Sequence, residues 1–268
     1  MKHRSWNMTM IFASAWALCG FAGSLTGAEV AVFILAGQSN AVGFGSDANE
    51  LPPALQSPQN DILFWFEEGP FNSVNDPGLR INSGDAFVAL QFQTDPSTAT
   101  FGGLVDGFGP EMTLGRNLAD ALGTQIAVVK FAINATSLAG EWNPDNPGAL
   151  YDQLTVVIAD AMSELTSLGH RGRIAGFFWM QGEWDARNAT DAGNYQTNLT
   201  NFIQQVRSEY GLPNLPFLFW AAERQPLHVT LWHHPGQPGY GASGPGGRGG
   251  LCSSDGNDRH RRFSPDRR

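Results

Sequence analysis

The sequence has only two cysteines, Cys19 and Cys252, and its N-terminal apolar segment at residues 10–21 is too short to span a membrane comfortably. Basic residues at positions 2–4 precede this segment, and small residues that suit a cleavage site lead up to Ala28. We therefore expect a secretory signal peptide over residues 1–28 and a mature protein that is secreted or periplasmic. Cleavage would leave Cys252 alone, which excludes an intramolecular disulfide in the mature chain.

Basic residues are also scarce, because 16 Lys and Arg face 25 Asp and Glu, for a net charge of −9. Residues 227–268 hold six Arg and three Asp, so this tail carries +3 and the rest of the chain carries −12. An acidic body argues against nucleic acid as the main partner. The mature chain of about 240 residues has the length of one α/β domain.

The middle of the chain alternates apolar runs with amphipathic segments. Strands are predicted near residues 30–36, 125–131, 173–180 and 215–221. Helices are predicted from Pro110-Glu111, where Leu114, Leu118 and Leu122 share a face, and near 150–168 and 195–210. This alternation predicts a three-layer α/β/α sandwich with a mainly parallel sheet.

Three polar segments follow predicted strands, at residues 37–40, 134–137 and 181–185. In a parallel sheet, loops that leave the carboxyl ends of strands emerge at one edge. A hydroxyl from Ser39, the backbone at Asn134 and Ala135, and the amide of Gln181 would meet there. A nucleophile beside neutral hydrogen-bond donors is what acyl transfer requires. Because Gly, Ser and Asn also favour turns, an ordinary strand-to-loop turn at 37–40 is the alternative.

The same segments resemble a known family. Phe33-Ile34-Leu35-Ala36-Gly37-Gln38-Ser39-Asn40, Phe108-Gly109-Pro110-Glu111 and Trp179-Met180-Gln181-Gly182-Glu183-Trp184-Asp185 are similar to the SGNH hydrolase superfamily, more narrowly to its sialate O-acetylesterase and acetylxylan esterase-like branch. The resemblance runs from about Val30 to Ala222. It implies an SGNH or flavodoxin-like fold and a serine-dependent esterase for acetylated carbohydrates. We expect no cofactor, no metal ion and no membrane partner after signal cleavage.

The resemblance also implies roles for individual residues. Ser39 would be the nucleophile. Its own amide, the Ala135 amide and the Gln181 side chain would form the oxyanion hole. The remaining site residues, expected to bind substrate or shape the site, are Gln38, Asn40, Asn134 and Glu183.

Two features depart from the family pattern. Alanine and asparagine occupy 134–135, where the family usually has paired glycines, and alanine cannot adopt every backbone conformation open to glycine. The late Asp-x-x-His block that carries the catalytic Asp and His is absent, because Gln225, Thr230, Leu231 and Asn257 stand three residues before the tail histidines. The catalytic partners of Ser39 are therefore not identified by the sequence.

The tail from Leu227 differs in composition from the body. It holds nine Gly, six Arg and four of the six His, with no Ile, Met, Glu or Lys, so it has no apolar face to bury. We interpret residues 29–226 as the esterase domain. Residues 227–268 would be a Gly/Arg/His-rich tail from an altered reading frame, which leaves the C-terminal part of the fold incomplete; a natural disordered extension is the alternative.

Weaker hypotheses concern other residues of the same loops. Glu183 and Asp185 resemble an acid pair of a glycosidase, but they stand close together on one loop. Trp142 and Trp184 are candidates for stacking on a sugar ring, although packing is the commoner role. The leading prediction is an exported carbohydrate O-acetyl esterase; the alternative is a non-catalytic or defective relative that binds glycans.

Overall fold

The computed structural model describes residues 27–94, 106–146, 149–220 and 229–232. Its main sheet has eight strands: β1 (Glu29–Gly37), β2 (Gln59–Gly69), β3 (Ile81–Asn82), β4 (Val88–Leu90), β7 (Ile126–Ile133), β8 (Arg171–Met180), β9 (Phe217–Trp220) and β10 (Val229–Trp232). A separate two-stranded sheet pairs β5 (Gln93–Thr94) with β6 (Asp106–Gly107). The predicted signal peptide (residues 1–28) lies outside the described residues up to residue 26. The predicted tail (residues 227–268) lies outside them except for Val229–Trp232, which form β10, so both stay predictions.

The strand order is β10-β9-β8-β1-β7-β2-β3, and β4 also pairs with β2. The five strands from β9 to β2 are parallel to their neighbours, whereas β10, β3 and β4 pair antiparallel at the two sides. The first strand lies at the centre, and β7 lies between β1 and β2, which differs from the flavodoxin order in the placement of one strand. The predicted mainly parallel sheet is confirmed.

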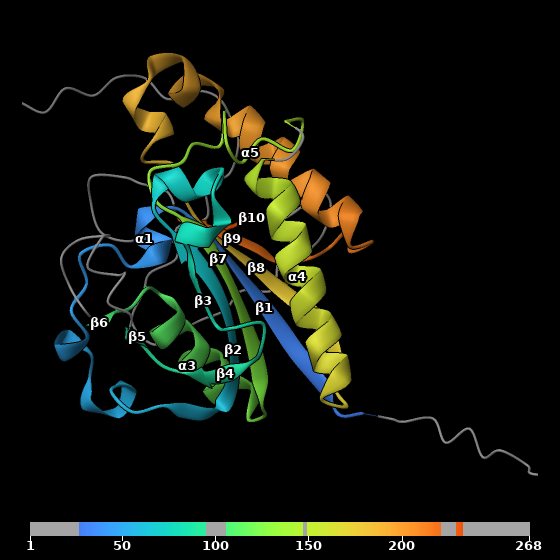
Figure 1. Ribbon diagram of the computed structural model, residues 1–268. Helices are drawn as coiled ribbons and strands as arrows, with labels where there is room; N and C mark the ends of the chain where they lie inside the picture. Colours follow the sequence, from blue (N-terminus) through green and yellow to red (C-terminus); the bar gives the residue numbers. More distant parts are fainter. Residues whose placement is uncertain (1–26, 95–105, 147–148, 221–228, 233–268) are drawn as a thin grey trace, which may run out of the picture. The chain divides into compact units, whose positions relative to one another are not determined.

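Helices cover both faces of the sheet. They are α1 (Ser39–Val42), α3 (Glu111–Leu122), α4 (Leu150–Ser167) and α5 (Ala189–Glu209), with short 3-10 turns at Ala48–Glu50, Pro53–Leu55, Phe71–Val74, Pro77–Leu79 and Asp185–Arg187. One face of β1 and β7 packs against α4 and α5, and the other packs against α3. Figure 1 shows α3 on one side of the sheet and α4 with α5 on the other. The three-layer α/β/α prediction is therefore confirmed.

Two features of the fold differ from the sequence prediction. Strand β2 was not predicted, although its apolar stretch at residues 62–66 is a readable signal. In α3 the buried face contains Met112, Gly115 and Ala119, whereas Leu122 is 50% exposed. Leu118 also packs against this core, so the leucine stripe lies at the border of the buried face rather than at its centre. Gly115 lies close to β4, because a Cβ there would lie 2.7 Å from Leu90 Cδ2.

No helix within the described ranges combines the length and the apolar character that a membrane crossing needs.

Candidate active site

The three motif loops leave the same edge of the sheet. Strands β7 and β8 flank β1, and Gly37 at the end of β1 is level with Ala132 and Met180 at the ends of its neighbours. All three strands are parallel, so the loops that follow them emerge side by side at the carboxyl edge. The sequence prediction that these loops share one edge is confirmed.

Close backbone contacts hold the turn that carries Ser39. Gly37 has φ 155°, and a Cβ there would lie 2.0 Å from the carbonyl oxygen of Met180, so this position requires glycine. The amide of Gln38 donates to the same oxygen at 3.0 Å. Ser39 then begins α1, and its carbonyl accepts from the amides of Gly43 at 3.0 Å and Phe44 at 2.9 Å. Its side chain is half-buried, and no described residue forms a hydrogen bond with the hydroxyl.

One carboxylate links the two residues that flank the serine. Glu183 accepts a hydrogen bond of 2.6 Å from Gln38 Nε2 at one oxygen and another from Asn40 Nδ2 at the other. Glu183 belongs to the loop after β8, so it ties this loop to the serine turn. This geometry fits the predicted site-shaping role of Gln38, Asn40 and Glu183.

The amide of Gln181 is buried and fully engaged. Its Nε2 donates to the carbonyl of Thr136 at 2.9 Å and to Oδ2 of Asp185 at 2.6 Å, and its Oε1 lies 3.1 Å from the Tyr195 hydroxyl. A primary amide has two hydrogens, so neither is left for an oxyanion. A role in the oxyanion hole, which stays a prediction, requires one of these bonds to be exchanged on substrate binding.

Asp185, buried beneath the site, joins the second and third loops. Its two oxygens accept from the amides of Leu138 and Ala139 at 2.9 Å each, in addition to the Gln181 bond. A carboxylate that is fully enclosed and saturated with donors does not suit the acid pair of a glycosidase. Its contact with the loop at 134–139 could not be predicted from the sequence, because 46 or more positions separate the partners.

The second loop, at residues 134–137, has a strained backbone at Ala135, as its sequence indicates. Ala135 has φ 58°, in the left-handed region that favours glycine. The amide of the preceding Asn134 donates to the Gly69 carbonyl at 2.8 Å, which anchors the loop to the end of β2. Ala135 itself is half-buried.

The two loop tryptophans have different surroundings. Trp142 is fully buried, donates from Nε1 to Thr136 Oγ1 at 2.8 Å, and packs edge-on against Phe131 and Trp179. It is a core residue and is not available for sugar stacking. Trp184 is 38% exposed, and the guanidinium carbon of Arg187 lies 4.4 Å from its ring centroid. Only Trp184 is therefore placed to meet a ligand.

The described residues place no histidine at this edge that could act as the base for Ser39. Their one histidine, His170, directly precedes β8, whereas Ser39 lies beyond the far end of the neighbouring β1. The ten residues of β8 span about 30 Å. The remaining candidates, His228, His233, His234 and His260, lie outside the described side chains. Within the described ranges, no cluster of three His, Cys, Asp or Glu side chains could hold a metal ion.

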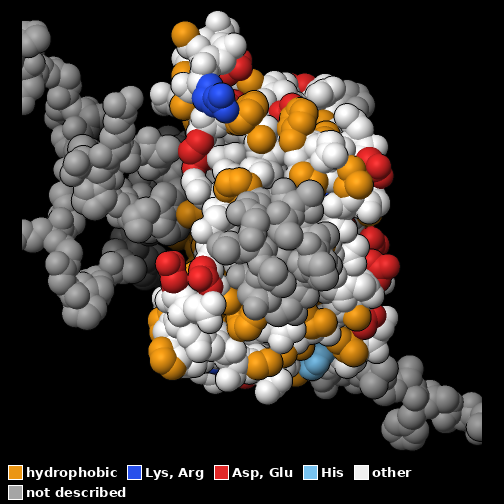
Figure 2. Space-filling view, turned by 60° about the vertical axis from the view of Figure 1, so that its left-hand side comes forward, with side chains coloured by type: hydrophobic (Ala, Val, Ile, Leu, Met, Phe, Trp, Pro, Cys, Tyr) orange, Lys and Arg blue, Asp and Glu red, His pale blue; other side chains and the backbone are white. Residues whose placement is uncertain are grey.

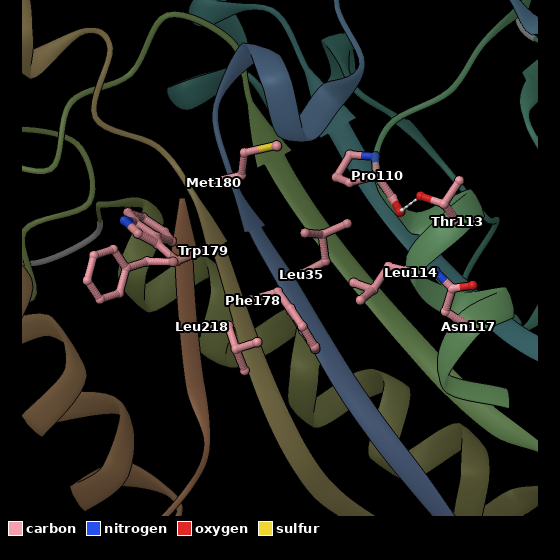
Figure 3. Close-up of a pocket in the computed structure, with 10 residues that line it drawn as sticks. Leu35, Pro110, Thr113, Leu114, Asn117, Phe178, Trp179, Met180 and Leu218 are labelled. Carbon is pink, nitrogen blue, oxygen red and sulfur yellow. Dashed lines mark hydrogen bonds between the residues drawn. The ribbon is translucent and has the colours of Figure 1, made fainter. Parts of the chain in front are cut away.

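A concavity of about 240 Å³ lies on the α3 side of the sheet. Figure 3 shows its wall formed by side chains of β1, β8 and β9, with α3 opposite. The lining is mainly apolar and includes Leu35, Leu114, Phe178 and Leu218. None of the polar residues of the three motifs lines this groove.

Together, the fold and the site define an α/β domain with a serine turn at the carboxyl edge, held by amide and carboxylate side chains from the neighbouring loop. The family described as carbohydrate esterase, sialic acid-specific acetylesterase, matches residues 29–236. This match spans well over half of the chain, and the chain belongs to that family. The predicted resemblance to the sialate O-acetylesterase-like branch is thereby confirmed.

The chain is also similar to individual proteins. A probable carbohydrate esterase from Arabidopsis thaliana is 27% identical over 195 residues, which cover 70% of this chain and 66% of that protein. A crystal structure of a protein from Arabidopsis thaliana matches with a TM-score of 0.48 at 23% identity, over 70% of this chain and 72% of that one. A carbohydrate acetylesterase from Xanthomonas citri matches with a TM-score of 0.44 at 18% identity, over 70% and 41% of the two chains.

Proposed function

We propose that the chain is an exported carbohydrate O-acetyl esterase in which Ser39 is the nucleophile. The observation that carries the proposal is the Glu183 carboxylate, which binds the side chains on both sides of Ser39 and so holds the serine turn at the sheet edge. Family membership supports the reaction class. Ser39 Oγ would attack the acetyl carbonyl and release the sugar hydroxyl, and water would then cleave the acetyl-serine to give acetate.

The rate depends on a base that the described residues do not supply. A hydroxyl without its His partner is a poor nucleophile, and loss of a triad member costs several orders of magnitude in rate. We therefore expect the 268-residue chain to hydrolyse acetyl esters slowly or not at all. A version whose coding sequence past Pro226 is read in another frame, and thereby gains an Asp-x-x-His block, should be active.

The test compares both versions on acetylated xylan, O-acetylated sialic acid and a chromogenic acetyl ester, with acetate release as the readout. Ser39→Ala should abolish the activity of the restored version. Ser57→Ala, an exposed serine away from the motifs, is the matched control. Activity that survives Ser39→Ala would show that another residue is the nucleophile. Export is tested separately, because mature protein recovered outside the cytoplasm should begin at Glu29.

The second candidate is a non-catalytic relative that binds glycans. For the 268-residue chain this second candidate is favoured, because the described residues at the carboxyl edge of the sheet include no His partner for Ser39. Calorimetric titration with acetylated and deacetylated xylan oligosaccharides distinguishes the two. Binding without turnover in the chain and in the restored version supports the second candidate, whereas turnover in the restored version supports the first.

A further inference from the structure

We propose that Lys130, Glu68 and Glu111 form a buried brace that positions the serine turn, with Lys130 as its central positioning residue. The consequence for catalysis rests on the proposed function, but the mechanical role does not. None of the three residues belongs to the motif loops that follow β1, β7 and β8. Glu111 lies in the segment 108–111, which the resemblance includes without a stated role.

Lys130 connects three elements at a single atom. It is fully buried in β7, and its Nζ lies 2.7 Å from Glu68 Oε2 in β2 and 3.0 Å from Glu111 Oε2 in α3. The same nitrogen donates to the carbonyl of Val42, the last residue of α1, at 3.2 Å. One hydrogen of the ammonium group is therefore committed to Val42, while its positive charge lies between the two carboxylates. The bond to Val42 also satisfies one of the carbonyls that a helix end leaves without a partner.

Residues 108–110, which precede α3, lie in close contact with the serine turn at residues 38–44. A Cβ on Gly109 would lie 2.4 Å from the Ala41 carbonyl oxygen, 2.5 Å from Glu111 Oε2 and 3.0 Å from Lys130 Nζ. Gly43 directly follows α1 and has φ 90°. A Cβ on Gly43 would lie 2.0 Å from the carbonyl oxygen of Phe108. Both glycines are therefore required for contact between the two segments.

Apolar packing beneath α1 is slight, which gives the brace its importance. The cluster there contains only Ala41, Val42 and Ala132, with Met180 packed against it. Small side chains bury little area, so the hydrophobic contribution to holding this turn is small. A charged donor to the Val42 carbonyl supplies a directional contact that these side chains cannot.

Three buried ionisable groups are costly, and such clusters are weak evidence for overall stability. Burial raises the pKa of Glu68 to about 7, against the opposing effect of Lys130. Burial alone would lower the pKa of Lys130, but the two carboxylates prevail and raise it, so the ammonium stays charged. An apolar cluster of the same volume would serve stability as well. Stability therefore does not explain why the Lys130 charge lies beside the end of α1. A role in positioning the serine turn does.

The experiment measures backbone amide hydrogen exchange in the full chain. In Lys130→Met, exchange in residues 38–44 should accelerate about tenfold or more, as the loss of a hydrogen bond from a charged donor implies, relative to α5. The matched control is Arg116→Met. Arg116 belongs to α3, the helix that carries Glu111, and the substitution removes its ion pairs to Asp61 and Asp120 without touching α1. It should leave residues 38–44 unchanged. A uniform acceleration across the molecule, or none, would overturn the proposal.

A second variant covers the case in which Lys130→Met does not fold. Combining Lys130→Met with Glu68→Gln and Glu111→Gln removes every charge from the brace. It still removes the hydrogen-bond donor to Val42. The same local acceleration at 38–44 is expected, and unchanged exchange there refutes the brace. Hydrogen exchange requires no turnover, so this outcome is independent of esterase activity. If the restored version is active, these variants should lower kcat with little change in KM.

Discussion

At the scale of single residues, Ala135 shows a position where the residue and its backbone conformation conflict. The structure gives Ala135 a φ of 58°, a conformation that suits the glycine expected here from the resemblance. An L-residue in this conformation costs about 1–2 kcal/mol because its Cβ crowds the following carbonyl oxygen. The loop thus keeps a glycine-like conformation at a residue that disfavours it.

Replacing Ala135 with glycine should therefore stabilise the protein. After allowing for the greater flexibility of glycine in the unfolded chain, we expect a gain of about 0.5–1 kcal/mol in the free energy of unfolding. Chemical denaturation measures it. Ala139→Gly, in the same loop but without positive φ, should have the opposite sign. Equal effects of the two substitutions would contradict the strain assigned to Ala135.

At the scale of elements, Asp185 holds together loops that follow different strands. Its carboxylate receives two backbone amides from the loop after β7 and the Gln181 amide from the loop after β8. The Tyr195 hydroxyl of α5 lies 2.6 Å from the Gln181 carbonyl, and burial raises the pKa of this hydroxyl well above its usual range. Hydrogen bonds thus connect the site to the helix layer, in addition to the apolar core that they share.

Asp185→Asn should lower the free energy of unfolding by about 2–4 kcal/mol, because an NH₂ group would replace an oxygen that faces only donors. Thermal and denaturant unfolding measure this loss. Asp160→Asn, an exposed position on α4, should change stability by about 0.5 kcal/mol or less. A similar small effect at Asp185 would show that the loops do not depend on this carboxylate.

At the scale of the whole molecule, an apolar groove remains on the α3 side of the sheet (Figure 3). Among described helices, α3 packs mainly against β7 and β2, and it leaves the groove at its border with β8 and β9. Figure 2 shows hydrophobic side chains scattered among polar ones on the face drawn there. The composition of residues 227–268, rich in Gly and Arg, gives no apolar helix that would fill such a groove.

Truncation after Trp232 should therefore leave the unfolding temperature within about 2 °C of the full chain, because segments with few apolar residues bury little surface. Thermal unfolding followed by circular dichroism measures this. Restoration of the other reading frame gives the contrasting case, in which a segment able to pack should raise the unfolding temperature. A clear loss on truncation would show that the present tail packs on the body and would contradict its interpretation as an altered frame.

How much could be predicted varies between elements. The strands near 30–36 and 173–180 and the helix near 150–168 agree with β1, β8 and α4 to within a few residues, because each has a strong apolar pattern. Strand β2 was missed because charged residues end it, and their partners Arg80 and Lys130 belong to other elements. In α3 the predicted stripe of Leu114, Leu118 and Leu122 is only partly buried, because periodicity alone cannot choose between two adjacent stripes of one helix.

The sequence by itself determined the layers, the family and the serine at the sheet edge, since these depend on local periodicity and on short contiguous motifs. The tertiary structure decided how the motifs cooperate. It linked Glu183 to both neighbours of Ser39, engaged the amide of Gln181, and placed Lys130 beneath α1. Apart from the bond between Gln181 and Asp185, these contacts join residues that are 45 to 145 positions apart. They follow from strand order and side-chain direction, which no local pattern contains.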